Sequence, residues 1–479
     1  MLYDIAIAGA GVTGGMLARE LTRYRLSCCI LEKENDVAMG ASKANSGIIH
    51  GGFDPEPGTL KARLNAEGVP LLYKAAQELH VPYRRNGSLV VAFDQTEEDT
   101  LQRLYERGLQ NGIAQMRLIS GEEARALEPN LSPEVTKALL VPTAGIICPY
   151  QLTIAAVGNA MDNGAELLRN FEIVSIEKEE YFTLHAKDGR TVQARFLVNC
   201  AGTSADRIAE MLHDRFYTVI PRAGEYLLLD KTEGKTVSHT IFQVPTKNGK
   251  GVLVTPTADG NLLLGPTASV VQEAEDTRTT PAGLDFVETF AKRSVPAVNT
   301  RNVITSFAGV RASEQGGDFI IRPSGKVDGF LHIAAIDSPG LSSCVAIAKY
   351  AVEQLRGMGL SAEPNPDFNG EREDPHAFRK MSDAEKDAFI KQHPAYGRIV
   401  CRCETVSEGE IRDSLHRNPA AADVDGVKRR TRSGMGRCQG GFCAPYVMRL
   451  IAEETRCPME QVTKKGGRSA MVFGEEEEA

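Results

Sequence analysis

Several kinds of segment are missing from this sequence, and each absence excludes a class of protein. No uninterrupted apolar run approaches the ~20 residues that a bilayer-spanning helix needs, so we expect no membrane span and at most peripheral membrane association. The formal net charge is −8, which disfavours a nucleic-acid-binding protein because such proteins need a basic face. No basic segment precedes the apolar residues 2–8, so we expect no signal peptide and a cytoplasmic location.

The composition is otherwise that of an ordinary globular protein. Apolar residues make up 42% and charged residues 25% of the 479 residues. A chain of this length exceeds one compact core, so we expect two or three domains. Internal repeats are absent, and the glutamates at 475–478 predict a solvated, disordered end.

The ten cysteines are distributed unevenly along the chain. Cys28, Cys29 and Cys200 lie in apolar, strand-like segments, where an inert buried thiol is expected. Four others gather in the last fifth of the chain, namely Cys401, Cys403, Cys438 and Cys443. This asymmetry calls for an explanation other than core packing.

The chain opens with a strand, a glycine-rich turn, a predicted helix at 16–24 and a predicted strand at 27–32. The turn, Gly9-Ala10-Gly11-Val12-Thr13-Gly14, has the pattern G-x-G-x-x-G, which lets the backbone approach a pyrophosphate at a helix N-terminus. Glu32 stands at the end of the second strand, where an acid accepts hydrogen bonds from a ribose diol, and Lys33 follows it. The pattern therefore predicts a dinucleotide site without a ribose 2′-phosphate, and it does not separate NAD from FAD.

Two later segments favour FAD by resemblance. Residues 196–202 run from a strand into a small-residue turn, and this segment resembles the one that returns to the dinucleotide site in FAD-dependent oxidoreductases of the D-amino-acid-oxidase type. Residues 336–342 precede a predicted helix at 344–355, so their backbone N–H groups could face a flavin ring or a phosphate. The resemblance implies FAD contacts at Ala201, Gly202, Pro339, Gly340, Leu341 and Ser342, and at Val174 through its backbone.

A loop rich in small residues, 42–52, contains a single histidine, His50. Small residues let a loop pass close over a flat cofactor, but a lone histidine is more often structural than catalytic. The loop resembles that of type II glycerol-3-phosphate oxidases and the related L-2-hydroxyglutarate oxidases. The resemblance implies that His50 is the base toward a substrate hydroxyl and that four residues lie along FAD, namely Ser42, Asn45, Ser46 and Gly47.

The same resemblance implies three substrate contacts, Lys250, Arg311 and Ser338, around a phosphate and a glycerol moiety. Arginine offers a planar fork and lysine a point charge to a phosphate dianion, and an imidazole can accept the alcohol proton near neutral pH. Lys250 is nearly as consistent with a solvated turn lysine, whereas Arg311 lies in a small, apolar stretch.

The four clustered cysteines have the spacing C-x-C, thirty-four residues, then C-x4-C. Two close thiolate pairs can hold Zn²⁺ or a [2Fe–2S] cluster, and the C-x-C half is unusual for structural zinc. The segment resembles bacterioferritin-associated ferredoxin domains, which favours the cluster and implies that electrons pass to an electron-accepting partner. The surrounding basic residues are either a solvated face, an offset to the charge of the cluster, or a docking site for an acidic partner: Arg402, Lys428, Arg429, Arg430, Arg432 and Arg437.

We therefore expect an α/β fold with three parts. A Rossmann-like FAD-binding domain is predicted at 1–80, 145–215 and 325–360, interleaved with an antiparallel-sheet substrate domain at 81–144 and 216–324. A linker at 361–397, a helical [2Fe–2S] domain at 398–455 and a tail at 456–479 follow. Within the linker, Ser382 and Glu385 predict a capped helix at 382–392.

The favoured activity is FAD-dependent oxidation of glycerol 3-phosphate by a dehydrogenase. Two alternatives stay open at this point. One is oxidation of a 2-hydroxy acid, as in L-2-hydroxyglutarate, or of an amino acid, with Arg311 paired to the carboxylate. The other is an electron-transfer subunit that holds FAD and the cluster but oxidises nothing itself. Residues 53–57 depart from the hydroxyglutarate pattern, which favours the glycerol-phosphate reading.

Overall fold

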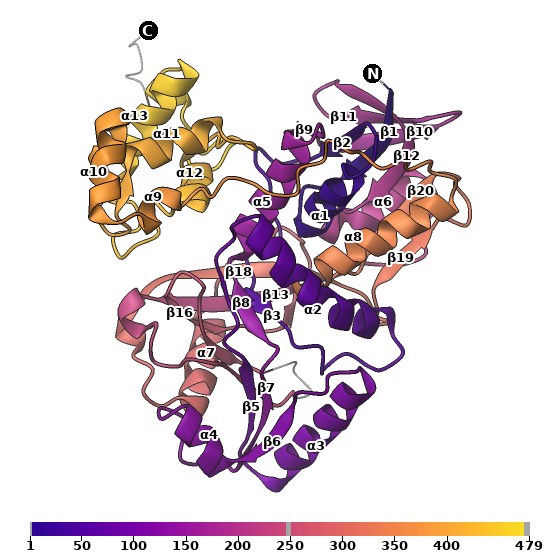
Figure 1. Ribbon diagram of the computed structural model, residues 1–479. Coiled ribbons are helices and arrows are strands. Elements are labelled where there is room, and N and C mark those ends of the chain that lie inside the picture. The colour runs from indigo at the N-terminus through magenta and orange to yellow at the C-terminus, as the bar shows by residue number, and fades with distance from the viewer. Residues whose placement is uncertain (1, 246–250, 474–479) are drawn as a thin grey trace.

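The computed structural model describes residues 2–245 and 251–473. In Figure 1 a sheet with flanking helices lies at the upper right, a second sheet lies below it, and a small helical module lies at the upper left. Lys250 and the glutamates at 475–478 lie outside the described residues. Within the described part of the chain, each helix is either too short or not apolar enough to cross a bilayer.

The first sheet has eight strands, and its centre is parallel. β1 (Leu2–Ala8) pairs in parallel with β2 (Cys28–Leu31) on one side and with β12 (Thr191–Asn199) on the other. The remaining strands are β9 (Glu166–Leu168), β10 (Ile173–Lys178), β11 (Phe182–Ala186), β19 (Ile320–Pro323) and β20 (Phe330–Ala334). The predicted strand–helix–strand opening and the α/β class are confirmed, as is the burial of the three core cysteines, which raises the pKa of Cys28 to about 12.

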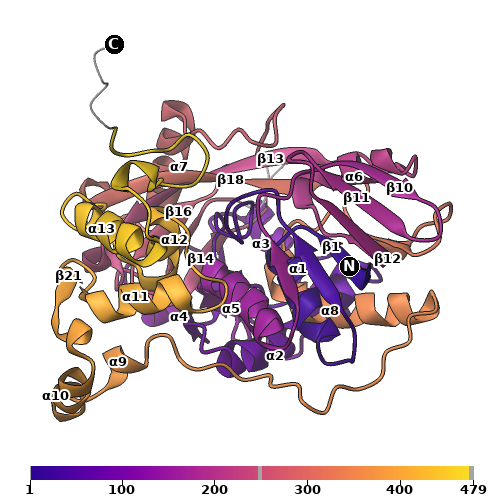
Figure 2. The same cartoon turned by 90° about the horizontal axis from the view of Figure 1, so that it is seen from above.

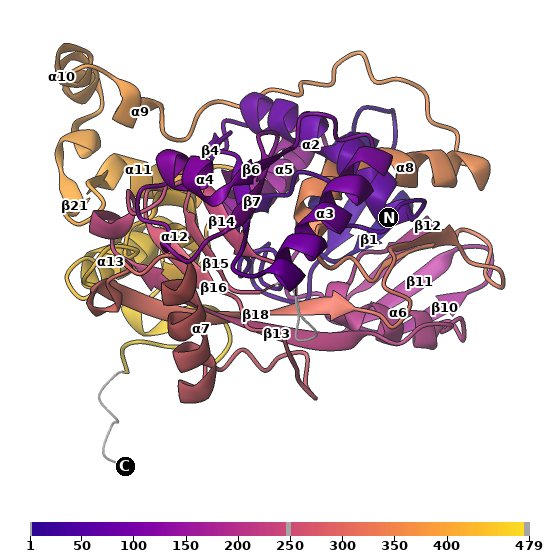
Figure 3. The same ribbon diagram turned by 90° about the horizontal axis from the view of Figure 1, so that it is seen from below.

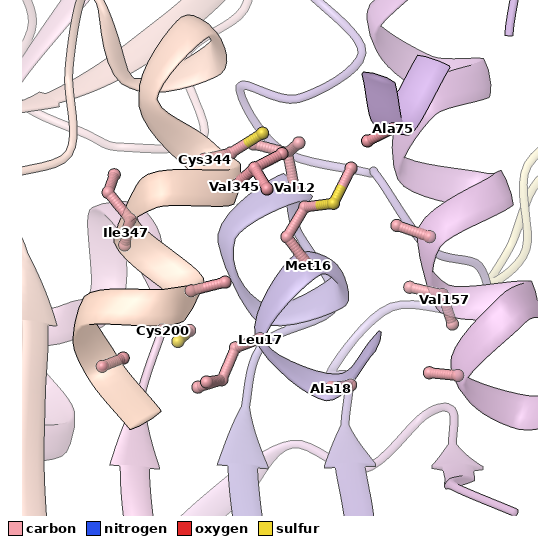
Figure 4. Close-up of a cluster of buried hydrophobic side chains, with 14 of the residues drawn as sticks. Val12, Met16, Leu17, Ala18, Ala75, Val157, Cys200, Cys344, Val345 and Ile347 are labelled. Atoms are coloured by element: carbon pink, nitrogen blue, oxygen red, sulfur yellow. The ribbon is translucent and has the colours of Figure 1, made fainter. Parts of the chain in front are cut away.

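Four helices pack together on one side of this sheet. They are α1 (Val12–Leu21), α2 (Leu60–Glu78), α5 (Pro149–Asp162) and α8 (Gly340–Gly357), and α6 (Ala205–Met211) packs separately against β10, β12 and β20. Figure 4 shows α1 between α8 and α5, where apolar side chains such as Met16, Val345 and Val157 meet.

Both predicted helices begin four residues earlier than expected, α1 at Val12 and α8 at Gly340. Glycines made these starts look like loops, because glycine has poor helix propensity. Packing overrides that propensity: a Cβ on Gly15 would press against Val157 of α5 at 2.9 Å, so a small residue is needed inside the helix.

The second sheet has nine strands and is largely antiparallel. Its long central pair is β13 (Ile220–Leu229) with β18 (Val303–Ser313). The others are β5 (Ser88–Ala92), β6 (Arg117–Ser120), β7 (Lys137–Val141), β14 (Thr240–Gln243), β15 (Leu253–Pro256), β16 (Leu262–Gly265) and β17 (Ser269–Val270). The helices of this part are α3 (Gln95–Gln110), α4 (Gly121–Leu127) and α7 (Pro281–Ser294). A small sheet of β3 (Ile48–Ile49), β8 (Gly145–Ile147) and β4 (Tyr83–Arg84) lies between α2 and the second sheet (Figure 1).

The C-terminal module is helical. It contains α11 (Glu408–His416), α12 (Val424–Thr431) and α13 (Ala444–Thr455) with the short strands β21 (Ile399–Cys401) and β22 (Val406–Ser407). Two helices, α9 (Ala377–Lys380) and α10 (Asp383–Gln392), precede it, and the predicted capping box of Ser382 and Glu385 is present at α10. Figure 3 shows the segment between α8 and α9 running along the outside of the helices that cover the first sheet to reach the module.

The predicted domain boundaries remain predictions, but three of them divide continuous structure. The boundary at 325 separates β19 from β20, which form an antiparallel pair in the first sheet. The predicted linker includes α10, whose Phe389 packs on Tyr396, and the Tyr396 hydroxyl donates to Asp413 of α11 in the module. The predicted tail includes Val462, which is buried in the hydrophobic core of the module. Sequence composition missed these contacts because they join segments that are polar or rich in turns.

Three of the six basic residues near the cysteines have a role that none of the three expectations covers. Arg429 and Arg430 bind the fully buried Asp36, and Arg432 binds Asp259 and Glu404. These arginines join the module to the rest of the protein, so they form neither a solvated face nor a partner-docking face.

Candidate functional site

One cavity of about 2130 Å³ lies between the first sheet, the second sheet and the module. This volume exceeds the ~300–1,000 Å³ of a typical small-molecule pocket, as a site for a dinucleotide plus a substrate would. Nearly all the predicted site residues that the structure describes line it: Gly9, Gly11, Val12, Thr13, Glu32, Lys33, Ser42, Asn45, Ser46, Gly47, His50, Val174, Ala201, Gly202, Arg311, Ser338, Pro339, Gly340, Leu341 and Ser342. Among the described residues predicted to bind FAD or substrate, Gly14 alone is absent from the lining; Lys250 lies outside the described residues.

The glycine turn is shaped by close backbone packing. Gly9 has φ of +107°, a region that favours glycine, and a Cβ there would lie 2.6 Å from the Cys200 carbonyl oxygen at the end of β12. A Cβ on Gly14 would overlap the Gly9 carbonyl, so the turn needs a glycine at position 14 because of close packing within the turn. The amide of Val12, at the start of α1, donates to Ser42 Oγ at 2.9 Å and so ties the His50 loop to the turn.

Glu32 is buried at the end of the second strand, and its carboxylate is held by the backbone. The amides of Ala10 and Glu34 donate to its two oxygens at 2.8 and 2.9 Å. Burial raises the pKa of Glu32 to about 7 in spite of these donors. The carboxylate faces the cavity with lone pairs left for further donors such as a ribose diol.

His50 is 6% exposed and is positioned by three elements. Its backbone amide donates to Ser342 Oγ at 2.7 Å in the first turn of α8, and Asn65 Nδ2 of α2 donates to its carbonyl at 3.2 Å. Its ring stacks on Phe53 with the centroids 4.9 Å apart. The loop that carries the histidine is thus fixed on both sides, and the imidazole stands at the cavity wall.

The second sheet supplies cationic and aromatic groups to the opposite wall. Arg311 on β18 lies directly across from Arg222 on β13, and both line the cavity. Tyr226, four residues after Arg222 on the same face of the strand, contacts Ser46 Oγ at 3.2 Å and stacks on Phe307. Sequence reasoning missed Arg222 and Tyr226; their period-two spacing was the available signal, but the pairing partner of the strand could not be read from it.

The turn before α8 is also held in place. Lys61 of α2 binds the Asp337 carboxylate at 2.6 Å, and Ser313 Oγ of β18 donates to its other oxygen at 3.1 Å. Ser338, next to Asp337, therefore faces the cavity from a turn that is anchored to both sheet parts.

The four clustered cysteines form two pairs in space. Cys403 Sγ and Cys438 Sγ are 3.6 Å apart on the exposed side, close to the ~3.8 Å expected for two thiolates on one tetrahedral metal with bonds of ~2.3 Å. Cys401 and Cys443 are buried, and contact with the Cys443 thiol lowers the pKa of Cys401 to about 5. Across the described residues, no three Cys, His, Asp or Glu side chains converge closely enough to hold one ion. Two pairs suit the two irons of a [2Fe–2S] cluster better than one four-sulfur zinc site.

Comparison with known proteins places these features in a family. Residues 4–354 match the family model "FAD dependent oxidoreductase", and residues 399–453 match "BFD-like [2Fe-2S] binding domain". The chain is 44% identical over 473 residues to a glycerol 3-phosphate dehydrogenase of Caloramator mitchellensis, an alignment that covers 99% of this chain and 98% of that protein.

Two shorter relatives match the part before the module. A glycerol 3-phosphate oxidase of Mycoplasma genitalium is 33% identical and is aligned over 98% of its length and 76% of this chain. The structure of L-alpha-glycerophosphate oxidase from Mycoplasma pneumoniae with FAD bound superimposes with a TM-score of 0.74 at 31% identity, over 78% of this chain and 98% of that one. The chain therefore belongs to the FAD dependent oxidoreductase family and carries a C-terminal BFD-like [2Fe-2S] binding domain.

Proposed function

We propose that this protein oxidises sn-glycerol 3-phosphate to dihydroxyacetone phosphate and passes the electrons onward through its [2Fe–2S] centre. The observation that carries the proposal is the convergence of His50 and Arg311 on one cavity with the glycine turn. The relative that matches almost the whole chain is named for the same substrate.

FAD, when bound, supplies a two-electron acceptor for hydride at N5. The turn residues Gly9–Thr13, the Ser42–Gly47 loop and the Ala201–Gly202 segment would hold it, together with Glu32 at the ribose. These residues fit the group, because they combine a glycine turn at a helix N-terminus, a buried acid and small side chains around one cavity.

The protein's own groups handle the proton and the charge of the substrate. His50 would accept the proton of the secondary alcohol, which must leave as the C–H bond is broken. Arg311 would bind the phosphate dianion, together with Lys250, while Ser338 would orient the glycerol moiety. The bond from the His50 amide to Ser342 and the stacking of its ring on Phe53 fix the imidazole, which supports a base with a defined approach to the alcohol.

The cysteine pairs support the second half of the proposal. The four thiolates would hold the cluster, which would supply a one-electron acceptor, so that the two electrons of a hydride could leave the flavin singly. Cys403 is exposed and Phe442, between Cys438 and Cys443, is 86% exposed, so this edge is open to an electron-accepting partner protein. A cytoplasmic location is part of the same proposal.

Anaerobic stopped-flow measurement of flavin bleaching tests the activity. Glycerol 3-phosphate is expected to bleach the flavin of the holoenzyme at least tenfold faster than L-2-hydroxyglutarate or amino acids at equal concentration. Faster bleaching by L-2-hydroxyglutarate would make this a 2-hydroxy acid dehydrogenase. No bleaching by any of these compounds would favour an electron-transfer subunit that oxidises nothing itself.

A further inference from the structure

The C-terminal module forms part of the wall of the dinucleotide cavity. Five of its side chains line the cavity together with the glycine turn and the His50 loop: Asp425, Lys428, Arg429, Met435 and Lys465. Figure 2 shows the module beside α5 and the second sheet, and α12, which carries Lys428, contacts α5. An electron-transfer appendage on a flexible tether would not line the cofactor cavity in this way.

A buried ion-pair cluster fixes the module in this position. Asp36, which follows the second strand and is fully buried, binds Arg429 at 2.6 Å and Arg430 at 2.8 Å. Asn35 donates to Asp423 at the start of α12. Burial acts in the opposite direction, yet the two guanidinium groups hold the pKa of Asp36 well below its ordinary range. The position of α12 against the cofactor cavity is thus set by charges that are costly to separate.

One lysine from each side of this junction lines the cavity without a carboxylate partner, although Lys43 Nζ contacts Met39 Sδ at 3.6 Å. Lys43 belongs to the His50 loop and Lys428 to α12, and both line the cavity. Throughout residues 2–245 and 251–473, no carboxylate oxygen lies within 4.0 Å of either ammonium group, whereas the neighbouring Lys464 binds Asp425 at 2.8 Å. Burial lowers the pKa of Lys43 to about 8 and also lowers the pKa of Lys428, which an anionic ligand would reverse.

The position of Lys43 indicates which anion would lie there. The preceding residue, Ser42, accepts the amide hydrogen of Val12 in the first turn of α1. Lys43 is therefore next to the helix N-terminus at which the glycine turn places a dinucleotide pyrophosphate. The ring of oxidised flavin is neutral, whereas the phosphates of FAD are negatively charged. Lysine ammonium groups would therefore bind the phosphates.

We propose that Lys428 of the module and Lys43 of the dinucleotide domain together bind the phosphates of FAD, so that the [2Fe–2S] module is a structural part of the FAD site. The proposal rests on FAD as the cofactor and is independent of which alcohol is oxidised. Retention of FAD and docking of the module are then coupled, because each ligand or contact that stabilises one stabilises the other.

Titration of the flavin-depleted full-length chain with FAD tests the proposal. Lys428→Met should weaken FAD binding about tenfold, which is the loss of one charge-assisted contact, and Lys43→Met should do the same. The Kd of the Lys428→Met variant should also depend less on salt concentration, because one cation fewer meets the phosphates. Lys428→Arg should restore most of the affinity.

Lys349→Met is the matched control, since Lys349 is an exposed lysine on α8 that does not line the cavity. An unchanged Kd in Lys428→Met would overturn the proposal. Equal weakening in Lys428→Met and Lys428→Arg would also overturn it, because the effect would then come from shape and not from charge. Substrate oxidation does not enter these measurements, so failure here is distinguishable from failure of the proposed activity.

Discussion

The position of His50 makes its proposed role directly testable at the level of one residue. Its backbone is fixed by Ser342 and Asn65, so His50→Ala should leave the loop in place and remove only the imidazole. A lost general base costs ~10²–10⁴-fold in rate. We expect flavin reduction by glycerol 3-phosphate to slow by about that factor, as measured by anaerobic stopped-flow, while FAD stays bound.

His185→Ala on β11, which does not line the cavity, is the control and should reduce its flavin at the unaltered rate. A His50→Ala enzyme that matches the unaltered protein at saturating substrate would remove the imidazole from the proposed chemistry.

Glu32 gives a pH-dependent prediction. Burial raises its pKa to about 7 in the ligand-free protein, and hydroxyl donors of a ribose favour the ionised form. A carboxyl with a raised folded-state pKa stabilises the ligand-free fold fully at low pH, and that contribution is lost as pH rises through about 7. The contribution of Glu32 to FAD binding, taken as the difference between the unaltered chain and Glu32→Gln, should therefore increase from pH 6 to pH 8.

Glu32→Gln should lack this part of the pH dependence in the range 6–8, measured as the FAD Kd of the flavin-depleted chain at each pH. A pH dependence that persists unchanged in Glu32→Gln would assign it to another group.

At the scale of elements, local patterns were predictable and pairings were not. The βαβ opening and the Ser382–Glu385 cap depend on neighbours within a few residues, and the structure has both. The pairing of Arg222 with Arg311 depends on the register of β13 against β18, two strands 74 residues or more apart in the chain. Such a pair carries no sequence signal of its own. That Lys43 and Lys428 line the same cavity depends likewise on how α12 docks, which the sequence does not reveal.

Loss of the cluster, unlike loss of the docked module, should leave flavin reduction by the substrate intact. Cys438→Ser removes one thiol of the pair with Cys403 that we propose as cluster ligands, so we expect iron and sulfide content to fall to background. Flavin reduction by substrate should stay within about twofold of the unaltered rate, whereas turnover coupled to the acceptor in a cell extract should be lost. Cys457→Ser, outside the quartet, should change none of these quantities. Coupled turnover that survives in Cys438→Ser would show that electrons leave by another route.

At the scale of the whole molecule, three charged junctions unite the parts that the sequence presents as separate domains. Asp36 with two arginines, Arg432 with Asp259, and Lys231 with Glu404 all cross from the module to the sheets. Most of these groups are buried, so solvent screening weakens them little. The cofactor cavity lies among the same parts, and its shape depends on their staying together.

Asp36→Asn tests this dependence. Removing one partner of a buried ion cluster costs about 3–5 kcal/mol, because two guanidinium groups lose their counter-charge. We expect the module to be released by limited proteolysis at pH 7 in the variant and to stay protected in the unaltered chain. Asp367→Asn, in the segment before α9, is the control and should stay protected.

The stability difference between the unaltered chain and Asp36→Asn should depend on pH in a direction that the shifted pKa of Asp36 fixes. The folded pKa of Asp36 is depressed, so its contribution is present above the unfolded pKa of about 4 and is lost as pH falls from there toward the folded value. The difference in unfolding free energy between the unaltered chain and Asp36→Asn, measured by urea denaturation, should be constant from pH 5 to 8. It should shrink below pH 4, because protonation removes the charge that the variant lacks. A difference that is absent at pH 7, with protection from proteolysis intact, would mean that other contacts hold the module on the cofactor cavity.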